Sequence, residues 1–160
     1  MSAAGQVEVV RGRIDEPLAA EIRAFWDSRG LLAPADAEER LGQVVCVLRS
    51  PEGEIRAINS AYARDVAMVG GRRFWSYRIA KDDDVGDGEF FSMLSGCFDA
   101  LAAEFAESGE GPVGVCLLVP DAVFLERNSE AIWPRSGFLH AGFAPDGTQL
   151  RIRYFEDARI

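Results

Sequence analysis

Residues Arg78–Leu94 read R-I-A-K-D-D-D-V-G-D-G-E-F-F-S-M-L, and the fold can be read outward from this stretch. A Gly-x-Gly pair, Gly86 and Gly88, stands between an apolar, aromatic strand pattern and an apolar helical pattern. Such an arrangement brings an anionic group against the backbone N–H groups of a helix N-terminus. The same loop carries four carboxylates, on Asp82–Asp84 and Asp87. The spacing therefore favours a phosphate group, whereas the charge opposes one.

The composition is that of one soluble globular domain. A chain of 160 residues with 48% hydrophobic and 27% charged residues is long enough for a single sizeable core. No apolar run approaches the roughly 20 residues of a membrane span, and the N-terminus lacks a basic segment followed by an apolar one. We therefore expect a single domain over residues 1–160, with residues 1–5 as a disordered terminus, located in the cytoplasm.

The charge balance restricts the partners. The net charge is −9, from 26 acidic and 17 basic residues. Such a balance repels both the nucleic acid backbone and anionic lipid, so neither is an expected partner. Self-association as a homodimer is left open.

Strand and helix patterns follow one another in an order typical of an α+β domain. Strands are expected at 7–14, 43–48, 55–66, 73–79, 113–119, 138–143 and 150–155, and helices at 18–26, from 35 or 36 to 41, 91–105 and 126–135. Tight turns at 51–54 and 69–72 join three strands into an antiparallel meander. The expected architecture is a mixed, mostly antiparallel central sheet flanked by helices.

This order, with a glycine loop between the fourth strand and the long helix, resembles the GNAT superfamily of N-acetyltransferases from about Val7 to Phe155. The superfamily's loop motif is Arg/Gln-x-x-Gly-x-Gly/Ala, and Asp83–Gly88 has its glycine spacing. The family also often ends its last helix with an aromatic residue four positions before a Gly-Phe pair. Trp133 stands in that relation to Gly137-Phe138, with Asn128 upstream.

The resemblance implies an acyl-CoA-dependent N-acyltransferase that uses acetyl-CoA as its co-substrate and acts on a small amine. By position, the fourth strand would line the pantetheine arm, the loop would form the pyrophosphate cradle, and the asparagine would lie near the arm. The implied cofactor-binding residues are Tyr77, Arg78, Ile79, Val85, Gly86, Asp87, Gly88, Glu89 and Asn128.

Two positions depart from the family pattern. Asp83 occupies the position of the motif's arginine or glutamine, so a hydrogen-bond donor has become a negative charge. Trp133 occupies the position of the tyrosine that commonly protonates the departing thiolate, and an indole N–H is no proton donor. The catalytic residues therefore stay unknown. Two alternatives remain open: a non-catalytic GNAT-like binding or interaction module, and an enzyme with a different acyl donor.

The remaining polar residues favour structural roles. Asp82–Asp84 are better explained as a solvated loop tip than as a cation site, so no metal is expected. The cysteines Cys46, Cys97 and Cys116 lie in apolar patterns and suit small buried hydrophobes. The single histidine, His140, is interpreted as structural. Asn59 stands in mid-strand, where asparagine is unusual, and is interpreted as facing a substrate cleft, with solvent as the alternative.

Overall fold

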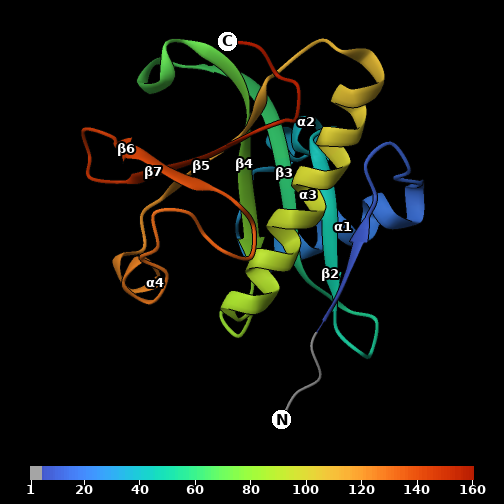
Figure 1. Ribbon diagram of the computed structural model, residues 1–160. Coiled ribbons are helices and arrows are strands. Elements are labelled where there is room, and N and C mark those ends of the chain that lie inside the picture. Colours follow the sequence, from blue (N-terminus) through green and yellow to red (C-terminus); the bar gives the residue numbers. More distant parts are fainter. Residues whose placement is uncertain (1–4) are drawn as a thin grey trace. The chain divides into compact units, whose positions relative to one another are not determined.

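The computed structural model describes residues 5–160, with only the backbone of Pro34. The described elements are β1 (Gln6–Val9), α1 (Glu16–Ser28), α2 (Pro34–Leu41), β2 (Val44–Arg49), β3 (Ile55–Val66), the 3-10 turn η1 (Ala67–Val69), β4 (Arg72–Lys81), α3 (Asp87–Ser108), β5 (Gly114–Val119), α4 (Ala122–Arg127), β6 (Leu139–Phe143) and β7 (Gln149–Tyr154) (Figure 1). No described helix is long and apolar enough to cross a membrane.

The strands form a seven-stranded sheet in the order β1-β2-β3-β4-β5-β7-β6. The pair β4–β5 is parallel, whereas β1–β2, β2–β3, β5–β7 and β6–β7 are antiparallel. The expected α+β fold with a mixed, mostly antiparallel sheet is thus confirmed. Two compact units divide the chain, one up to Ala61 together with Arg78–Ala100, the other comprising Tyr62–Tyr77 and Leu101–Ile160. The single domain over 1–160 stays a prediction.

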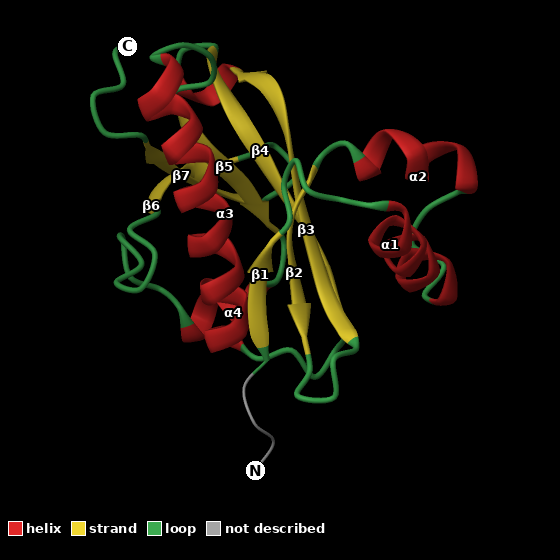
Figure 2. Ribbon diagram, turned by 90° about the vertical axis from the view of Figure 1, so that its right-hand side faces the viewer, coloured by secondary structure: helices red, strands yellow, loops and turns green. Residues whose placement is uncertain are grey.

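The first unit has α1 and α2 on one side of β1 and β2, and the first part of α3 on the other (Figure 2). Helix α1 begins where the Asp15 side chain accepts the Leu18 N–H at 3.0 Å. Ile22, Phe25 and Trp26 follow at helical spacing and are all buried. They pack with residues of β2, β3 and α2 in one hydrophobic cluster.

The polar residue in the middle of β3 belongs to this core. Asn59 is fully buried, and its Oδ1 accepts the Cys46 N–H at 2.7 Å beside a register shift in β2–β3. Its Nδ2 donates to the Met93 carbonyl of α3 at 3.0 Å. The interpretation that Asn59 faces a substrate cleft is therefore wrong, because both ends of its amide bind backbone groups of the core.

The second unit is built on β5, which pairs with β7 on one side and with β4 on the other. The β4–β5 register joins Trp75 to Val115 and Ser76 to Cys116. A second cluster of buried residues forms its core: Val66, Phe74, Cys116, Leu150 and Ile152. The strand expected at 113–119 is thus β5.

Two elements differ most from the predictions. The strand expected at 7–14 ends at Val9, because the chain turns through Gly12, whose φ of +73° is left-handed. The helix expected at 126–135 is wrong for most of its length, because α4 covers Ala122–Arg127 and residues 128–135 are not helical. The Asp121 side chain accepts the N–H groups of Val123 and Phe124 at 3.0 and 3.1 Å and so caps the helix there.

Residues 1–4 of the expected disordered terminus lie outside the described residues. The fifth residue, Gly5, donates its N–H to the Glu89 Oε2 at 2.8 Å, directly before β1 begins. This contact brings the start of the described chain to the N-terminus of α3.

Candidate functional site

The glycine loop joins β4 to α3 within the first unit. The Asp82 N–H donates to the Arg56 carbonyl at 2.9 Å, and the Val85 N–H donates to the Asp82 carbonyl at 3.1 Å. The side chain of Val85 is buried and anchors this turn. The Gly86 carbonyl then accepts the first helical hydrogen bond, from the Phe90 N–H at 2.9 Å. Gly86 is therefore the N-terminal cap of α3, a helix of 22 residues.

Backbone donors gather at this end of the helix. The first four N–H groups of an α-helix have no intrahelical acceptor, and the helix dipole makes the same end attractive to anions. In α3 these are the amides of residues 86–89. Asp87 is half-buried, whereas Gly86 and Gly88 are exposed. The loop therefore offers a set of main-chain donors that solvent can reach.

Gly86 is a glycine that the fold itself does not require. A Cβ atom built on it would meet no other heavy atom within 4 Å, and its φ lies outside the left-handed range. Other glycines of this chain are explained by their backbone, such as Gly53 with a φ of +88°. The bare backbone at Gly86 thus leaves open space beside a helix N-terminus, as a bound group that approaches the backbone would need.

A carboxylate of the chain partly occupies the same place. Glu89 Oε1 accepts the Gly86 N–H at 3.3 Å, a contact that resembles one half of a capping box. Glu89 Oε2 accepts the Gly5 N–H at 2.8 Å and one N–H of Arg56 at 3.1 Å. The Glu89 side chain is therefore an internal anion at the start of α3.

Two arginines offset the acidity of the loop. Arg29, just after α1, binds both oxygens of Asp82 at 2.5 and 3.0 Å. Its guanidinium holds the pKa of the Asp82 carboxyl below the ordinary value. Arg56, on β3, lies 2.9 Å from Asp84 as well as 3.1 Å from Glu89. Asp83 and Asp84 are exposed, as expected of a solvated loop tip, whereas Asp82 is half-buried in its pair with Arg29.

The sequence did not identify either arginine as a partner of the loop, and Lys81, the nearest basic residue before the loop, is exposed at the end of β4. Asp83 is also exposed. Arg29 stands 53 residues from Asp82, and Arg56 stands 33 residues from Glu89. No spacing in the sequence connects residues so far apart, although the antiparallel meander predicts that β3 and β4 are neighbours.

The β4 residues implied in pantetheine binding are more enclosed than the loop. Tyr77 is buried in the second unit. In the first unit, Arg78 is half-buried and donates from Nη2 to the Gln43 Oε1, and Ile79 is half-buried. The structure brings Val85–Glu89 together at one helix end.

Asn128 is placed in the second unit, at the C-terminal end of α4. Its Nδ2 donates to the Phe124 carbonyl at 3.0 Å, and its own carbonyl accepts the Trp133 Nε1–H at 2.9 Å. Both groups of Asn128 therefore support the local backbone after α4.

Trp133, at the position of the family's proton donor, lies in a buried cluster. Its indole is fully buried and contacts the Phe124 ring edge-to-face at 5.8 Å. The guanidinium of Arg151 lies 4.3 Å from the indole centroid and donates to the carbonyls of Glu130 and Ala131 at 2.8 and 3.1 Å. Burial lowers the pKa of Arg151. This cluster fixes the segment after α4. None of the three side chains Phe124, Trp133 and Arg151 is an acid that could protonate a leaving group.

The cysteines Cys46, Cys97 and Cys116 are buried, as predicted. Burial raises the pKa of the Cys46 thiol to about 12 and also raises the pKa of Cys116, so neither is a thiolate at neutral pH. His140 is exposed on β6 and its ring lies 5.1 Å from that of Phe143. Among residues 5–160, no group of three or more metal-ligating side chains lies together.

Comparison with known proteins rests on structure alone, since no family model and no curated protein matches this chain. One similar structure is a GNAT superfamily phosphinothricin acetyltransferase from Sinorhizobium meliloti in complex with AcCoA, with a TM-score of 0.59 and 15% identity over 96% of this chain and 89% of that chain. Another is the GNAT family N-acetyltransferase YhbS from Escherichia coli in complex with CoA, with a TM-score of 0.59 and 18% identity over 98% and 84%. This chain has the GNAT fold.

A third similar structure carries a different description. A structure described as a bacterial toxin matches with a TM-score of 0.58 and 13% identity, over 98% of this chain and 93% of that chain. At these identities the likeness shows the GNAT fold alone. The activity of this chain must therefore be argued from its own residues.

Proposed function

We propose that this protein is an acyl-CoA-dependent N-acyltransferase that acts on a small amine, with acetyl-CoA as the acyl donor. The observation that carries the proposal is Gly86. Its bare backbone has no reason within the fold, and it caps the N-terminus of a 22-residue helix in a GNAT fold.

The residues at the start of α3 fit a diphosphate group. The amides of residues 86–89 supply donors, and the space beside Gly86 allows close approach of an anion. Arg29 and Arg56 offset the charge of Asp82 and Asp84, which removes part of the repulsion expected from the sequence. We propose that Val85–Glu89 hold the pyrophosphate, that Tyr77–Ile79 line the pantetheine arm, and that Asn128 lies near that arm.

The bound donor would supply a thioester, an activated acyl group that an amine attacks. The chain would contribute binding and orientation through the loop amides. Cys46 and Cys116 are excluded as nucleophiles by their raised pKa values, and Trp133 is excluded as a proton donor because its N–H is a buried hydrogen-bond donor to Asn128. No residue is assigned as the general base.

A second candidate is a binding module that has lost its cofactor, and Glu89 favours it. Its carboxylate already accepts the Gly86 N–H and is held by Arg56 and the Gly5 N–H. In such a module Glu89 would replace the diphosphate permanently. In the enzyme, the long 3.3 Å contact to Gly86 would be exchanged for contacts to the ligand.

Acetyl-CoA distinguishes the two candidates. For the enzyme we expect about 1 mM acetyl-CoA to raise the melting temperature, since a ligand that binds the folded state alone stabilises it. Release of free thiol in the presence of a panel of small primary amines would then report acyl transfer. An unchanged melting temperature, with and without Mg²⁺, would overturn the enzyme proposal and leave the module.

A further inference from the structure

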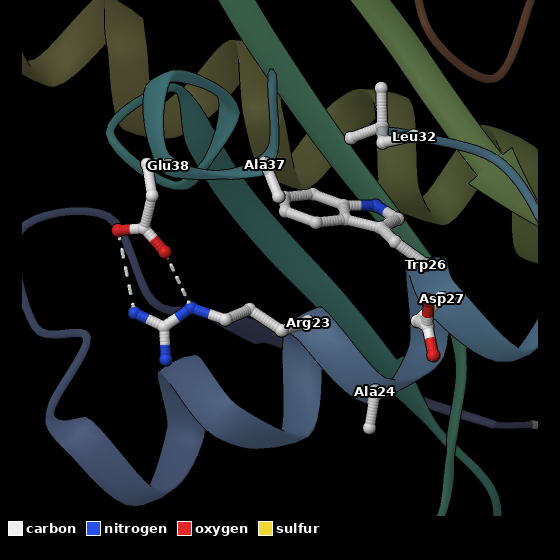
Figure 3. A pocket seen from close by; sticks show the side chains of 7 residues that line it. All are labelled: Arg23, Ala24, Trp26, Asp27, Leu32, Ala37 and Glu38. Carbon is white, nitrogen blue, oxygen red and sulfur yellow. Dashed lines mark hydrogen bonds and ion pairs between the residues drawn. The ribbon is translucent and has the colours of Figure 1, made fainter. Parts of the chain in front are cut away.

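Arg64, on β3 in the second unit, is a positive charge for which the fold supplies no acceptor. Its Nε is buried without a hydrogen-bond partner, and in the part of the chain that the structure describes its guanidinium binds no oxygen atom. Other arginines are held by carboxylates. Figure 3 shows Arg23 turned towards Glu38, at 2.8 Å, and Arg49 binds Glu21 at 2.6 Å. Because a buried donor without a partner is costly, Arg64 has a capacity for an anion from outside the chain.

The neighbours of Arg64 are the last paired residues of β4 and β5. The β4–β5 register ends at Ser76 and Cys116, and both side chains are buried. Burial raises the pKa of the Cys116 thiol, whereas the positive charge of Arg64 and the Ser76 hydroxyl lower it. The three side chains therefore lie together, although they come from three neighbouring strands. They combine one positive charge with a hydroxyl and a thiol.

This face of the second unit opens just beyond the three side chains. Residues two apart on a strand share a face, so Val66 lies on the face of Arg64 and Leu118 on the face of Cys116. Val66 packs with Cys116 in the buried core, whereas Leu118 is 42% exposed. Arg64 is itself half-buried. It therefore stands at the border of the core, with an apolar surface near it that solvent reaches.

A carboxylate is the anion that suits a single arginine. The planar guanidinium presents N–H groups that match the two oxygens of a carboxylate, and one positive charge compensates one negative charge. A phosphate dianion would leave a charge uncompensated at the border of the core, which is unfavourable. The net charge of −9 also opposes a more highly charged anion.

We propose that Arg64 binds the carboxylate of the acceptor, and that the acceptor is an α-amino acid with an apolar side chain. The guanidinium holds the carboxylate, the apolar side chain packs on Leu118, and the amine stays free to attack the thioester. The inference rests on the proposed function for the identity of the occupant, since β4 continues from Ser76 into Tyr77, the first residue proposed for the pantetheine arm.

Three related probes test the assignment on the wild-type protein. L-Leucine carries both groups, isocaproate lacks the amine, and isoamylamine lacks the carboxylate, while the apolar part is the same. Titration calorimetry at low salt, up to about 20 mM, would cover the affinities of such small ligands. We expect leucine and isocaproate to bind, and isoamylamine to bind about tenfold or more weakly, as for loss of a hydrogen bond between charged groups.

Variants test the same contact from the protein side. Arg64→Gln removes the charge and should weaken leucine and isocaproate about tenfold or more, with isoamylamine unchanged. Arg64→Lys keeps the charge without the planar group and should retain part of the affinity. Arg73→Gln is the matched control, because Arg73 is an exposed arginine of the same unit that lies 3.6 Å from Asp65. It should bind all three probes as wild type does.

Stability separates a binding role from a role in the fold. Arg64→Gln loses no bond to an oxygen atom, so its melting temperature should equal or exceed that of wild type. A melting temperature well below that of Arg73→Gln would assign Arg64 to the fold and overturn the proposal. The proposal is also overturned if wild type binds neither leucine nor isocaproate, or if Arg64→Gln and Arg73→Gln bind them equally.

The affinity for CoA shows which of the two proposals fails. The glycine loop lies in the first unit, so Arg64→Gln should bind CoA as wild type does. Carboxylate binding that depends on Arg64 in a protein that does not bind CoA would keep the anion site and overturn acyl transfer. Binding of CoA without binding of leucine or isocaproate would keep acyl transfer and overturn the anion site.

Discussion

The loop before α3 and the segment after α4 hold their charges in opposite ways. In the loop, Asp82 and Asp84 are paired with Arg29 and Arg56 near the surface, where solvent and ligands compete for the same groups. In the segment after α4, Arg151 is 1% exposed and binds main-chain carbonyls over an indole ring. Charges of the first kind can be exchanged for a ligand at little cost, whereas Arg151 is committed to the fold.

The largest effect is expected on stability, for substitution of the buried Arg151. Arg151→Met keeps the volume but leaves the carbonyls of Glu130 and Ala131 and the side chain of Gln149 without their donor. We expect a loss of about 2–3 kcal/mol in the free energy of unfolding, measured by urea denaturation. Arg135→Met, an exposed arginine of the same segment, should change stability by less than about 0.5 kcal/mol. Equal effects of the two variants would remove the contrast between the regions.

An intermediate effect is expected in the loop, on binding and not on stability. Asp83→Arg restores a positive charge at the position where the family has a donor. If the loop faces a diphosphate, we expect CoA to bind about tenfold more tightly at low salt, with the gain reduced at high salt. Titration calorimetry would measure the dissociation constant. Glu107→Arg, in the last turn of α3, makes the same charge change and should leave CoA affinity unaltered; a gain as large as that of Asp83→Arg would mean that net charge alone is responsible.

The smallest effect concerns the pH dependence of the Arg29–Asp82 pair. The Arg29 guanidinium lowers the pKa of Asp82 in the folded state. The stabilisation by this pair is therefore fully present above the unfolded pKa of about 3.9, and it is lost as the pH falls through the pKa of the folded state. Because both side chains are about one-third exposed, solvent reduces the contribution to about 0.5 kcal/mol. Asp82→Asn should therefore be less stable than wild type at pH 7 by that amount and equal to it near pH 2. A difference that persists at low pH would assign the effect to packing.

The same contrast explains which parts of the molecule could be predicted from the sequence. The helix around Phe91–Phe105 and the strand at Val113–Val119 follow from local apolar periodicity. The helix expected at 126–135 is wrong for most of its length, because the capping signal of Asp121 starts a helix at Ala122, which ends at Arg127. That signal is local and was available in the sequence.

The position of the helix N-terminus at the candidate site could be predicted from the sequence, whereas the ion-pair partners of its acidic residues could not. Gly86 and Gly88 mark the helix N-terminus by spacing alone. The partners of the acidic residues, Arg29 and Arg56, come from α1's end and from β3, and their positions follow from tertiary folding. Asn59 was misjudged for the same reason, since the Cys46 and Met93 backbone groups that it binds are distant in sequence.

The claim at the centre of this account is that the backbone at Gly86 is bare for a ligand and not for the fold. Its most direct test is the dissociation constant of CoA for wild type, Gly86→Ala and Gly42→Ala. Both glycines accept a Cβ without strain: Gly86 has open space, and Gly42, at the end of α2 with φ −67°, meets its nearest atom at 3.6 Å. Both variants should be as stable as wild type or slightly more so. We predict that Gly86→Ala weakens CoA binding about tenfold or more, as for loss of close backbone approach, while Gly42→Ala binds as wild type. Wild-type affinity in Gly86→Ala would contradict the account.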